Sequence, residues 1–292
     1  MRRSTLAGLA VTGAAVLFGS TFVVIKDVVA HFPPINFVAW RFLLGGLALG
    51  VLSLPRGRKL WRDAGITGSL LFVGYAAQTV GLTTTGASNS ALITGLFVIV
   101  TPLLVAIMAR RPPGGWVVVG AVTAFMGVVL LTADEGLQLL PGDLLTLVCA
   151  GAFAGHIVAL SRFAPRHKVV PFTAAQLLVT AVLAFPLAAL LEGVSPPGAR
   201  EVPALLLTAF GVSAGAFLLQ IWAQTVIGPA RTGILLTLEP VFAVATAALV
   251  LDERLTPTGW LGAALIVGAI YLVVTKGEEM SPIETEMISA AR

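Results

Sequence analysis

The sequence predicts an all-α membrane protein in which ten transmembrane helices form two inverted five-helix repeats, with both termini in the cytoplasm. Of its 292 residues, 57% are hydrophobic and only 11% are charged, whereas a soluble domain carries about 25% charged residues. Ten apolar stretches are each long enough to cross the roughly 30 Å hydrocarbon core of a bilayer. The lysines and arginines between these stretches lie mostly on one side. A soluble globule is therefore excluded.

The first apolar stretch, Thr5 to Ile25, follows two arginines as a signal peptide would. Its apolar part is longer than that of a typical signal peptide, and Lys26 and Asp27 stand where a cleavage site is expected, so we interpret it as a helix of the mature protein. Proline, glycine or charge separates the later spans. In order, these are Pro34 to Leu54, Ala64 to Thr83, Ala87 to Ala109, Gly114 to Thr132, Gly142 to Ala164, Pro171 to Leu191, Pro203 to Thr225, Gly233 to Leu251 and Pro257 to Thr275.

These spans are interpreted as helices because they are continuous runs rich in Leu, Ala and Gly. A transmembrane β-strand would instead alternate apolar and polar residues over about ten positions. Several glycines have the spacing that lets helices approach closely, and we expect helix contacts there. They are Gly45, Gly46, the pair Gly151 and Gly155, and the pair Gly211 and Gly215.

The basic residues orient the chain. With a cytoplasmic N-terminus, the outer side holds only Lys26, Arg200 and Arg254, and Arg41 lies within a span. The other fourteen are on the inner side: Arg2, Arg3, Arg56, Arg58, Lys59, Arg62, Arg110, Arg111, Arg162, Arg166, Lys168, Arg231, Lys276 and Arg292. This bias predicts a multi-pass protein of the cell inner (cytoplasmic) membrane with cytoplasmic termini.

The two halves share a short pattern, which predicts an internal duplication. Thr94, Gly95 and Pro102 recur as Thr232, Gly233 and Pro240. We expect residues 1–135 to form the first five-helix repeat, 136–276 the second, and 277–292 a cytoplasmic tail. Because five is odd, the second repeat must enter the membrane from the opposite face, as in many secondary transporters.

Three motifs resemble the EamA branch of the drug/metabolite transporter superfamily. The stretch GLTTTGASNSALITGLFVIVTPLL at Gly81 to Leu104 resembles the family's fourth-helix signature, and FGSTF at Phe18 to Phe22 its first-helix motif. LEPVFA at Leu238 to Ala243, with LDERLT and GAALIVGAIYLV after it, is similar to the ninth and tenth helices. The resemblance implies ten helices in inverted repeats, cytoplasmic termini and export of small metabolites such as amino acids.

Glu239 is the first candidate for a transport role because it lies near the middle of the ninth span, before Pro240. An ionised carboxylate there costs several kcal/mol unless it is paired or takes a proton. Glu239 is therefore a candidate for proton coupling or cation recognition. The alternative is a structural role, in which it bonds backbone groups freed by Pro240 or pairs with a basic residue.

Arg41 and His156 are the other ionisable candidates within spans. Arg41 has the geometry to hold a substrate carboxylate through its planar fork, or it is a charge-paired or snorkelling arginine that fixes packing. His156 is a candidate to donate to a substrate or relay a proton, or it is a packing histidine.

The remaining site candidates are uncharged. Gln78, Asn89, Ser90 and Thr94 are candidates to line a cavity near the midplane, and Tyr75 and Trp222 to wall it. Gln220 and Gln224 fit a cavity and interhelical hydrogen bonding equally well. Pro102 and Pro240 occupy matching positions in the two repeats, where they are expected to kink or gate their helices.

Together these residues predict a secondary transporter that exports small metabolites, such as amino acids, by alternating access, with proton coupling as one hypothesis. The alternative is an uncoupled facilitative carrier. An intramembrane enzyme lacks its usual motifs here, and a non-transporting scaffold is the remaining alternative. The expected partners are the lipid bilayer, a small-molecule substrate and protons; we expect no cofactor, metal site, nucleic acid or obligate protein partner. A disulfide within the chain is excluded because Cys149 is the single cysteine.

Overall fold

A computed structural model describes residues 3–108, 110, 112–131, 140–236 and 238–276, and all regular elements in these ranges are helical. The predicted tail, 277–292, lies outside the described residues. In chain order the elements are α1 (Arg3–Val29), α2 (Pro34–Leu52), α3 (Arg58–Gly81), α4 (Ala87–Thr94), α5 (Phe97–Met108), α6 (Gly115–Leu131), α7 (Pro141–Phe163), the 3₁₀ turn η2 (Ala164–Arg166), α8 (Val169–Leu191), α9 (Val202–Leu206), the π-helical η3 (Leu207–Ala216), α10 (Phe217–Leu236), α11 (Leu238–Val250) and α12 (Pro257–Lys276).

Local sequence explains several helix ends. Pro34, Pro141 and Pro257 open α2, α7 and α12, where the missing proline N–H costs no helical hydrogen bond. Gly193 follows the end of α8 with a φ of 73°, a conformation in which glycine carries no Cβ penalty. These ends lie where the sequence pattern predicted breaks.

The chain is a multi-pass membrane protein by helix length and composition. Within the described residues, six helical segments are long and apolar enough to cross a bilayer: Arg3–Val29, Pro34–Leu52, Ala87–Met108, Pro141–Arg166, Val169–Leu191 and Val202–Val226. Three shorter apolar segments lie within α6, α11 and α12. The third predicted span coincides with α3 but is not among them, because Tyr75, Gln78 and several glycines make it less apolar.

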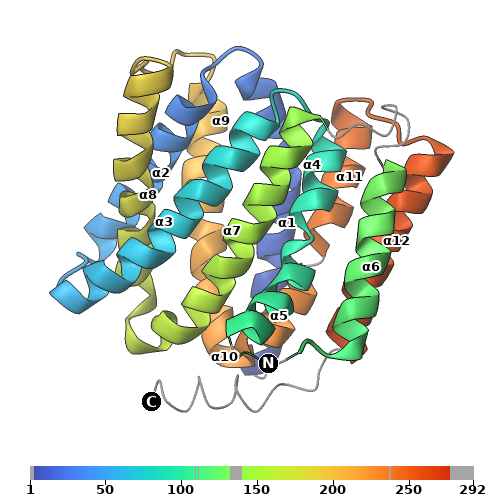
Figure 1. The fold of residues 1–292 in the computed structure, drawn as a ribbon. Helices are drawn as coiled ribbons and strands as arrows, with labels where there is room; N and C mark the ends of the chain where they lie inside the picture. Colours follow the sequence, from blue (N-terminus) through green and yellow to red (C-terminus); the bar gives the residue numbers. More distant parts are fainter. Residues whose placement is uncertain (1–2, 109, 111, 132–139, 237, 277–292) are drawn as a thin grey trace.

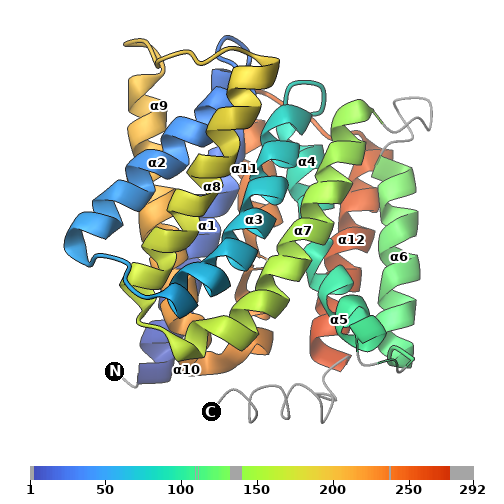
Figure 2. The same ribbon diagram turned by 60° about the vertical axis from the view of Figure 1, so that its left-hand side comes forward.

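Helices from the two halves of the chain pack against each other throughout the fold. In both views α6 lies beside α12, and α2 packs on α8 (Figures 1 and 2). Several other contacts come in matching pairs: α1 packs on α11 as α7 packs on α4 and α5, and α2 packs on η3 as α8 packs on α3. The core therefore runs between the halves, with α1 behind α3, α4 and α7 in Figure 1.

Two spans differ from the prediction in where they are interrupted. The predicted fourth span is two helices, because α4 ends at Thr94 and α5 begins at Phe97. The predicted loop between the eighth and ninth spans, residues 226–232, is wrong: α10 continues through it. Gly228 and Pro229 signalled a break, but one proline removes only one helical hydrogen bond and a helix can bend around it.

The predicted glycine contacts hold for Gly45, Gly46 and Gly155, where a Cβ added at Gly155 of α7 would lie 3.3 Å from Leu70 Cδ2 of α3, and fail for the others. A Cβ added at Gly45 or Gly46 would lie 2.9 Å from an atom of η3 or α8 respectively, so α2 approaches both closely. The expectation is wrong for Gly151, Gly211 and Gly215, where such a Cβ would meet no atom of another element within 4 Å. Their spacing alone did not show which face of the helix meets a neighbour.

Candidate functional site

A central cavity lies among α1, α3, α5, α7, α10 and α11. About 500 Å³ of space that no atom fills lies within it, open solvent included, of which about 40 Å³ can hold the centre of a water-sized sphere. Its lining is mainly aromatic and aliphatic, with six residues that carry a polar atom. The lining residues are Phe18, Thr21, Phe22, Leu71, Tyr75, Gln78, Phe97, Phe153, His156, Ile157, Phe217, Gln220, Leu236 and Glu239. An apolar cavity with a few convergent polar groups is the usual form of a small-molecule site.

Glu239 is the carboxylate of this cavity. Glu239 is 8% exposed, and its carboxylate forms no ion pair among the described residues. It lies in the first turn of α11, where the helix dipole favours negative charge. The N-terminal end of α11 therefore offsets only part of the free-energy cost of burying the Glu239 charge.

The break between α4 and α5 lies beside Pro240, the residue after Glu239. A Cβ added at Gly95, between α4 and α5, would lie 2.8 Å from Cγ of Pro240. On the other side a Cβ at Gly19 of α1 would meet the Glu239 carbonyl oxygen and would lie 2.9 Å from Cβ of Phe242. Close packing on both sides fixes the backbone that carries Glu239. The interruption in the fourth span lies at Gly95, and Pro102 is inside α5.

Two other predicted residues in the cavity wall have hydrogen-bond partners behind the wall. Gln78 Nε2 donates to Thr94 Oγ1 at 3.1 Å, and His156 Nε2 lies 2.9 Å from Gln176 Oε1. These bonds orient both side chains while their residues line the cavity. Tyr75 lines it too, and its ring packs edge-on against Phe153 with centroids 5.1 Å apart.

The structure places four other predicted residues outside the cavity lining. Ser90 Oγ lies 3.3 Å from Thr146 Oγ1, and Thr94, besides accepting from Gln78, lies 4.0 Å from Cys149 Sγ. These hydroxyls join α4 to α7. Asn89 and Trp222 are both half-buried, and Trp222 packs against the main apolar core.

Arg41 lies within the protein interior, 1% exposed. Its Nε donates to Ser213 Oγ at 2.8 Å, which connects α2 to η3. Its Cζ lies 4.9 Å from the centroid of the Tyr75 ring and 5.3 Å from that of Phe42. Arg41 does not itself line the cavity, but Tyr75 contacts both.

Comparison with known proteins assigns the chain to a family. The profile of the EamA-like transporter family matches it twice, over residues 5–133 and 140–275. The chain belongs to the EamA-like transporter family. This family is part of the drug/metabolite transporter superfamily, so the resemblance seen in the sequence is confirmed. The family also points to a transporter rather than an enzyme.

Relatives of this EamA-like transporter are themselves named as transporters. An uncharacterized transporter from Archaeoglobus fulgidus is 30% identical over 267 residues, which cover 91% of this chain and 85% of the relative. The uncharacterized transporter YyaM from Bacillus subtilis is 32% identical over 136 residues, or 43% of this chain and 44% of the relative. A crystal structure of a protein with 24% sequence identity superposes with a TM-score of 0.65, covering 92% of this chain and 96% of that one. This superposition shows that the two chains share a fold.

Sequence reasoning missed two carboxylates that hold one end of this EamA-like transporter together. The Glu192 carboxylate accepts from the backbone N–H groups of Ile35 and Asn36 at 3.0 Å each, at the start of α2. Glu253 does the same at the start of α4, accepting from Ala87 at 2.9 Å and Ser88 at 3.0 Å. Both carboxylates tie a loop of the second half to a helix start of the first. In sequence they looked like ordinary loop charges.

Lys26 adds a further connection at this end. Its Nζ donates to the carbonyl oxygens of Leu82 at 2.9 Å and Thr85 at 2.6 Å. The sequence predicted only that Lys26 lies on the outer side, without a partner. The structure shows that it links the end of α1 to the connection between α3 and α4.

A buried polar cluster lies at the opposite end of the transporter. Asp63 is fully buried. Its Oδ2 lies 2.9 Å from His167 Nε2, and its Oδ1 accepts a hydrogen bond from Arg62 at 2.9 Å. The His167 ring stacks on Phe172 with centroids 4.9 Å apart. This cluster connects α3 to the segment before α8.

Two polar residues of the lining, Gln220 and Thr21, were not assigned to the site by the prediction. Gln220, left open between two roles, lines the cavity. So does Thr21, whose Oγ1 also donates to the Phe18 carbonyl at 2.7 Å; the FGSTF motif was its only signal.

Within the described residues, His, Cys, Asp and Glu form no group of three or more suited to a metal ion.

Proposed function

We propose that this protein is a secondary transporter that exports small amphipathic metabolites, amino acids among them, across the cytoplasmic membrane by alternating access. Its family supports small-molecule transport. The observation that carries the proposal is the central cavity with Glu239 in its wall. Aromatic and aliphatic walls fit the apolar part of such a metabolite, and Gln78, His156 and Gln220 offer hydrogen bonds to its polar part.

The proposed architecture is ten spans in two inverted repeats, residues 1–135 and 136–276. The family profile matches each half separately, which supports a duplication. The matching contact pairs support it too, because a two-fold axis in the membrane plane would relate α1 with α11 to α7 with α4 and α5. In such folds the substrate site lies at the interface of the repeats, as the cavity does here.

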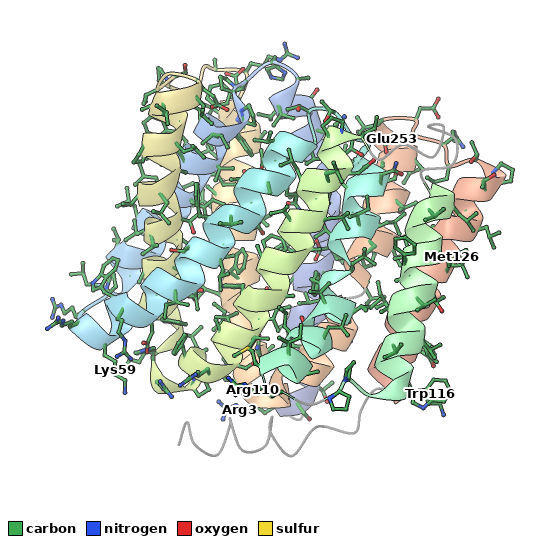
Figure 3. The ribbon with its side chains drawn as sticks, viewed as in Figure 1. Arg3, Lys59, Arg110, Trp116, Met126 and Glu253 are labelled. Carbon is green, nitrogen blue, oxygen red and sulfur yellow. The ribbon has the colours of Figure 1, made fainter. Side chains whose placement is uncertain are left out.

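The distribution of charge supports cytoplasmic termini. Arg3, Lys59 and Arg110 lie at one end of the bundle, and Glu253 lies at the other (Figure 3). Basic residues concentrate on the cytoplasmic side of membrane proteins. The end that carries Arg3 is therefore assigned to the cytoplasm.

Glu239 is proposed as the proton-coupling residue. Its carboxylate is buried among apolar side chains, and its charge has no ion-pair partner among the described residues. Binding a proton removes the charge, and so does pairing with a cationic substrate group. If the two states compete at Glu239, a proton gradient drives substrate movement.

The test uses purified protein reconstituted into liposomes. Uptake of leucine, phenylalanine and their relatives is measured with and without a pH gradient for the native protein, Glu239→Gln, Glu239→Asp and Asp252→Asn. Asp252 is a matched control because its side chain is exposed at the outer end. We expect the gradient to accelerate uptake in the native protein and Asp252→Asn, less so in Glu239→Asp, and not at all in Glu239→Gln.

Each other outcome contradicts a defined part of the proposal. If gradient dependence is unchanged in Glu239→Gln, Glu239 does not couple protons. If the native protein takes up a panel compound with no gradient dependence, the protein is an uncoupled carrier. If the native protein moves none of the panel, the proposed substrate class is wrong.

A further inference from the structure

Arg41 is a buried charge with incomplete bonding. It is the largest of the fully buried side chains in the described residues. Ser213 accepts from its Nε at 2.8 Å, but its Nη1 is buried and has no hydrogen-bond partner. Nearly all buried polar atoms have a partner in native proteins, so an unpaired guanidinium nitrogen requires an explanation.

No carboxylate of the described residues forms an ion pair with this charge. In the described part of the chain, ion pairs link His31 to Glu201, Arg254 to Asp252, and Asp63 to its two partners, none of them Arg41. A guanidinium keeps its proton in proteins, so Arg41 cannot neutralise itself as a lysine or carboxylate would. The two neighbouring rings compensate the charge only in part, through their negatively polarised faces.

Tyr75 separates Arg41 from the cavity. Its ring is 4.9 Å from the Arg41 Cζ, and the same residue lines the cavity that contains Glu239. Phe42 covers another part of the guanidinium, with its centroid 5.3 Å from Cζ. Tyr75 is thus a neighbour of Arg41 that also reaches the cavity.

The element opposite Arg41 is itself irregular. Ser213 belongs to η3, a ten-residue π-helical segment. Wide helical turns of this kind are rare and occur frequently at functional sites. A Cβ at Gly45 would lie 3.2 Å from Cβ of Ser213, so α2 and η3 are closely packed and hold the serine against Arg41. The guanidinium is thus bonded to Ser213 through Nε, whereas its Nη1 has no hydrogen-bond partner among the described residues.

We propose that Arg41 is an anion-binding subsite of the cavity, covered by Tyr75 in this structure and uncovered when the Tyr75 ring turns aside. The ligand is a small anionic group, a carboxylate or a halide, which accepts hydrogen bonds from the guanidinium. The substrate's own carboxylate and a free inorganic anion are the two sources of this chemistry. The role in transport rests on the proposed function; the binding site itself does not. A zwitterionic amino acid would meet Arg41 with its carboxylate and Glu239 with its ammonium.

Covering of Arg41 by the Tyr75 ring lowers the apparent affinity of the site for an anion. A site that is open in only a fraction of molecules binds with an affinity reduced by that fraction. If Tyr75 stands aside in about one molecule in ten, its replacement by alanine strengthens the apparent affinity for a small anion about tenfold. A purely structural Arg41, held by rings on both sides, predicts no such gain.

The experiment measures thermal stabilisation of the purified full-length protein by added ligands, because a ligand that binds the folded state raises its unfolding midpoint. The probes are chloride, acetate, and the pair leucine and leucinamide, which differ in the carboxylate. Ionic strength is held constant with sodium HEPES. The variants are Arg41→Gln, Tyr75→Ala, Tyr75→Phe and the double variant Arg41→Gln with Tyr75→Ala. Arg254→Gln is the control, since that arginine is exposed.

We expect the native protein and the Arg254 control to respond alike, and Tyr75→Phe, which keeps the covering ring, to lie closer to them than to Tyr75→Ala. Tyr75→Ala responds at about one-tenth of the anion concentration, and the double variant loses that response. A response to chloride identifies a free anion as the ligand. A response to acetate and leucine, without one to chloride or leucinamide, identifies the substrate's carboxylate.

The proposal is overturned if Tyr75→Ala and the double variant respond identically to every probe. This comparison remains possible if Arg41→Gln alone does not fold, because Arg41→Lys with Tyr75→Ala can replace the double variant and is expected to bind more weakly without the fork. Binding is read separately from flux. A protein that binds acetate through Arg41 but transports nothing refutes only the proposed function. One that transports leucine and ignores every anion refutes only this subsite.

Discussion

Substitution of Gly19 by alanine tests whether the contact between α1 and α11 holds Glu239 in place. A Cβ at Gly19 would lie 2.9 Å from Cβ of Phe242 and 3.0 Å from the backbone nitrogen of Ala243, in addition to meeting the Glu239 carbonyl. Real Cβ atoms essentially never approach other atoms so closely. Two of the three atoms belong to the backbone of α11, so the clash cannot be relieved by a rotamer change.

Gly13, on the same helix, provides the matched control. A Cβ there would meet nothing within 4 Å. Both substitutions gain the same helix propensity, about 1 kcal/mol for alanine over glycine, so this gain cancels in the comparison. The difference between the variants isolates the overpacking, which costs about 1 to 3 kcal/mol in a closely packed core. We expect the upper end because backbone must move.

The assay is unfolding of the purified variants in detergent micelles, followed by helical circular dichroism. Gly13→Ala is expected to unfold at or slightly above the native midpoint, and Gly19→Ala clearly below it. Flux in liposomes should also fall for Gly19→Ala, because the displaced backbone carries Glu239. If the two variants differ by less than about 0.5 kcal/mol, the usual range of surface substitutions, α1 and α11 are not packed as described.

Two further predictions concern the ends of the bundle. Glu192→Ala removes the carboxylate that accepts two backbone N–H groups at the start of α2, and should cost about 1 to 3 kcal/mol in thermal unfolding; an equal loss for the exposed Asp252→Ala would contradict this. Burial by itself raises the pKa of Asp63, which precedes the third predicted span, but hydrogen bonds with His167 and Arg62 outweigh it and leave that pKa below its usual value. A lowered folded pKa stabilises the protein above the unfolded value of about 3.9, and the stabilisation is lost as pH falls through the folded value. Asp63→Asn should therefore flatten the acid side of the stability profile, and an unchanged acid side would show that Asp63 is not the group responsible.

Local sequence predicted the helices well where the signal was itself local. Runs of apolar residues located nearly all the elements, and prolines located the starts of α2, α7 and α12. It failed at Gly228 and Pro229, because whether a helix bends or ends at a proline depends on what packs against it. It also failed to locate the interruption at Gly95, where Pro240 from the other half packs in the space that a side chain would fill.

The candidate site was predictable where a residue is conspicuous by chemistry. Glu239 was found because a carboxylate is rare in an apolar span, and Gln78, Tyr75 and His156 because polar side chains stood out against the same background. Serine and threonine were harder to place. Ser90 and Thr94 share a helix face with the expected spacing, yet they bond to α7 and to Gln78 instead of lining the cavity.

The sequence by itself determined the class of the protein: its apolar spans require a bilayer, and its motifs identify its family. Only the tertiary structure decided how its few charges are satisfied. Arg41 bonds to a serine 172 positions away, and Glu192 holds the start of a helix 157 positions before it. Burial and partner distance are properties of the packed bundle, and composition along one span does not encode them. For the same reason only packing separates Glu239, in the cavity wall, from Arg41, behind Tyr75.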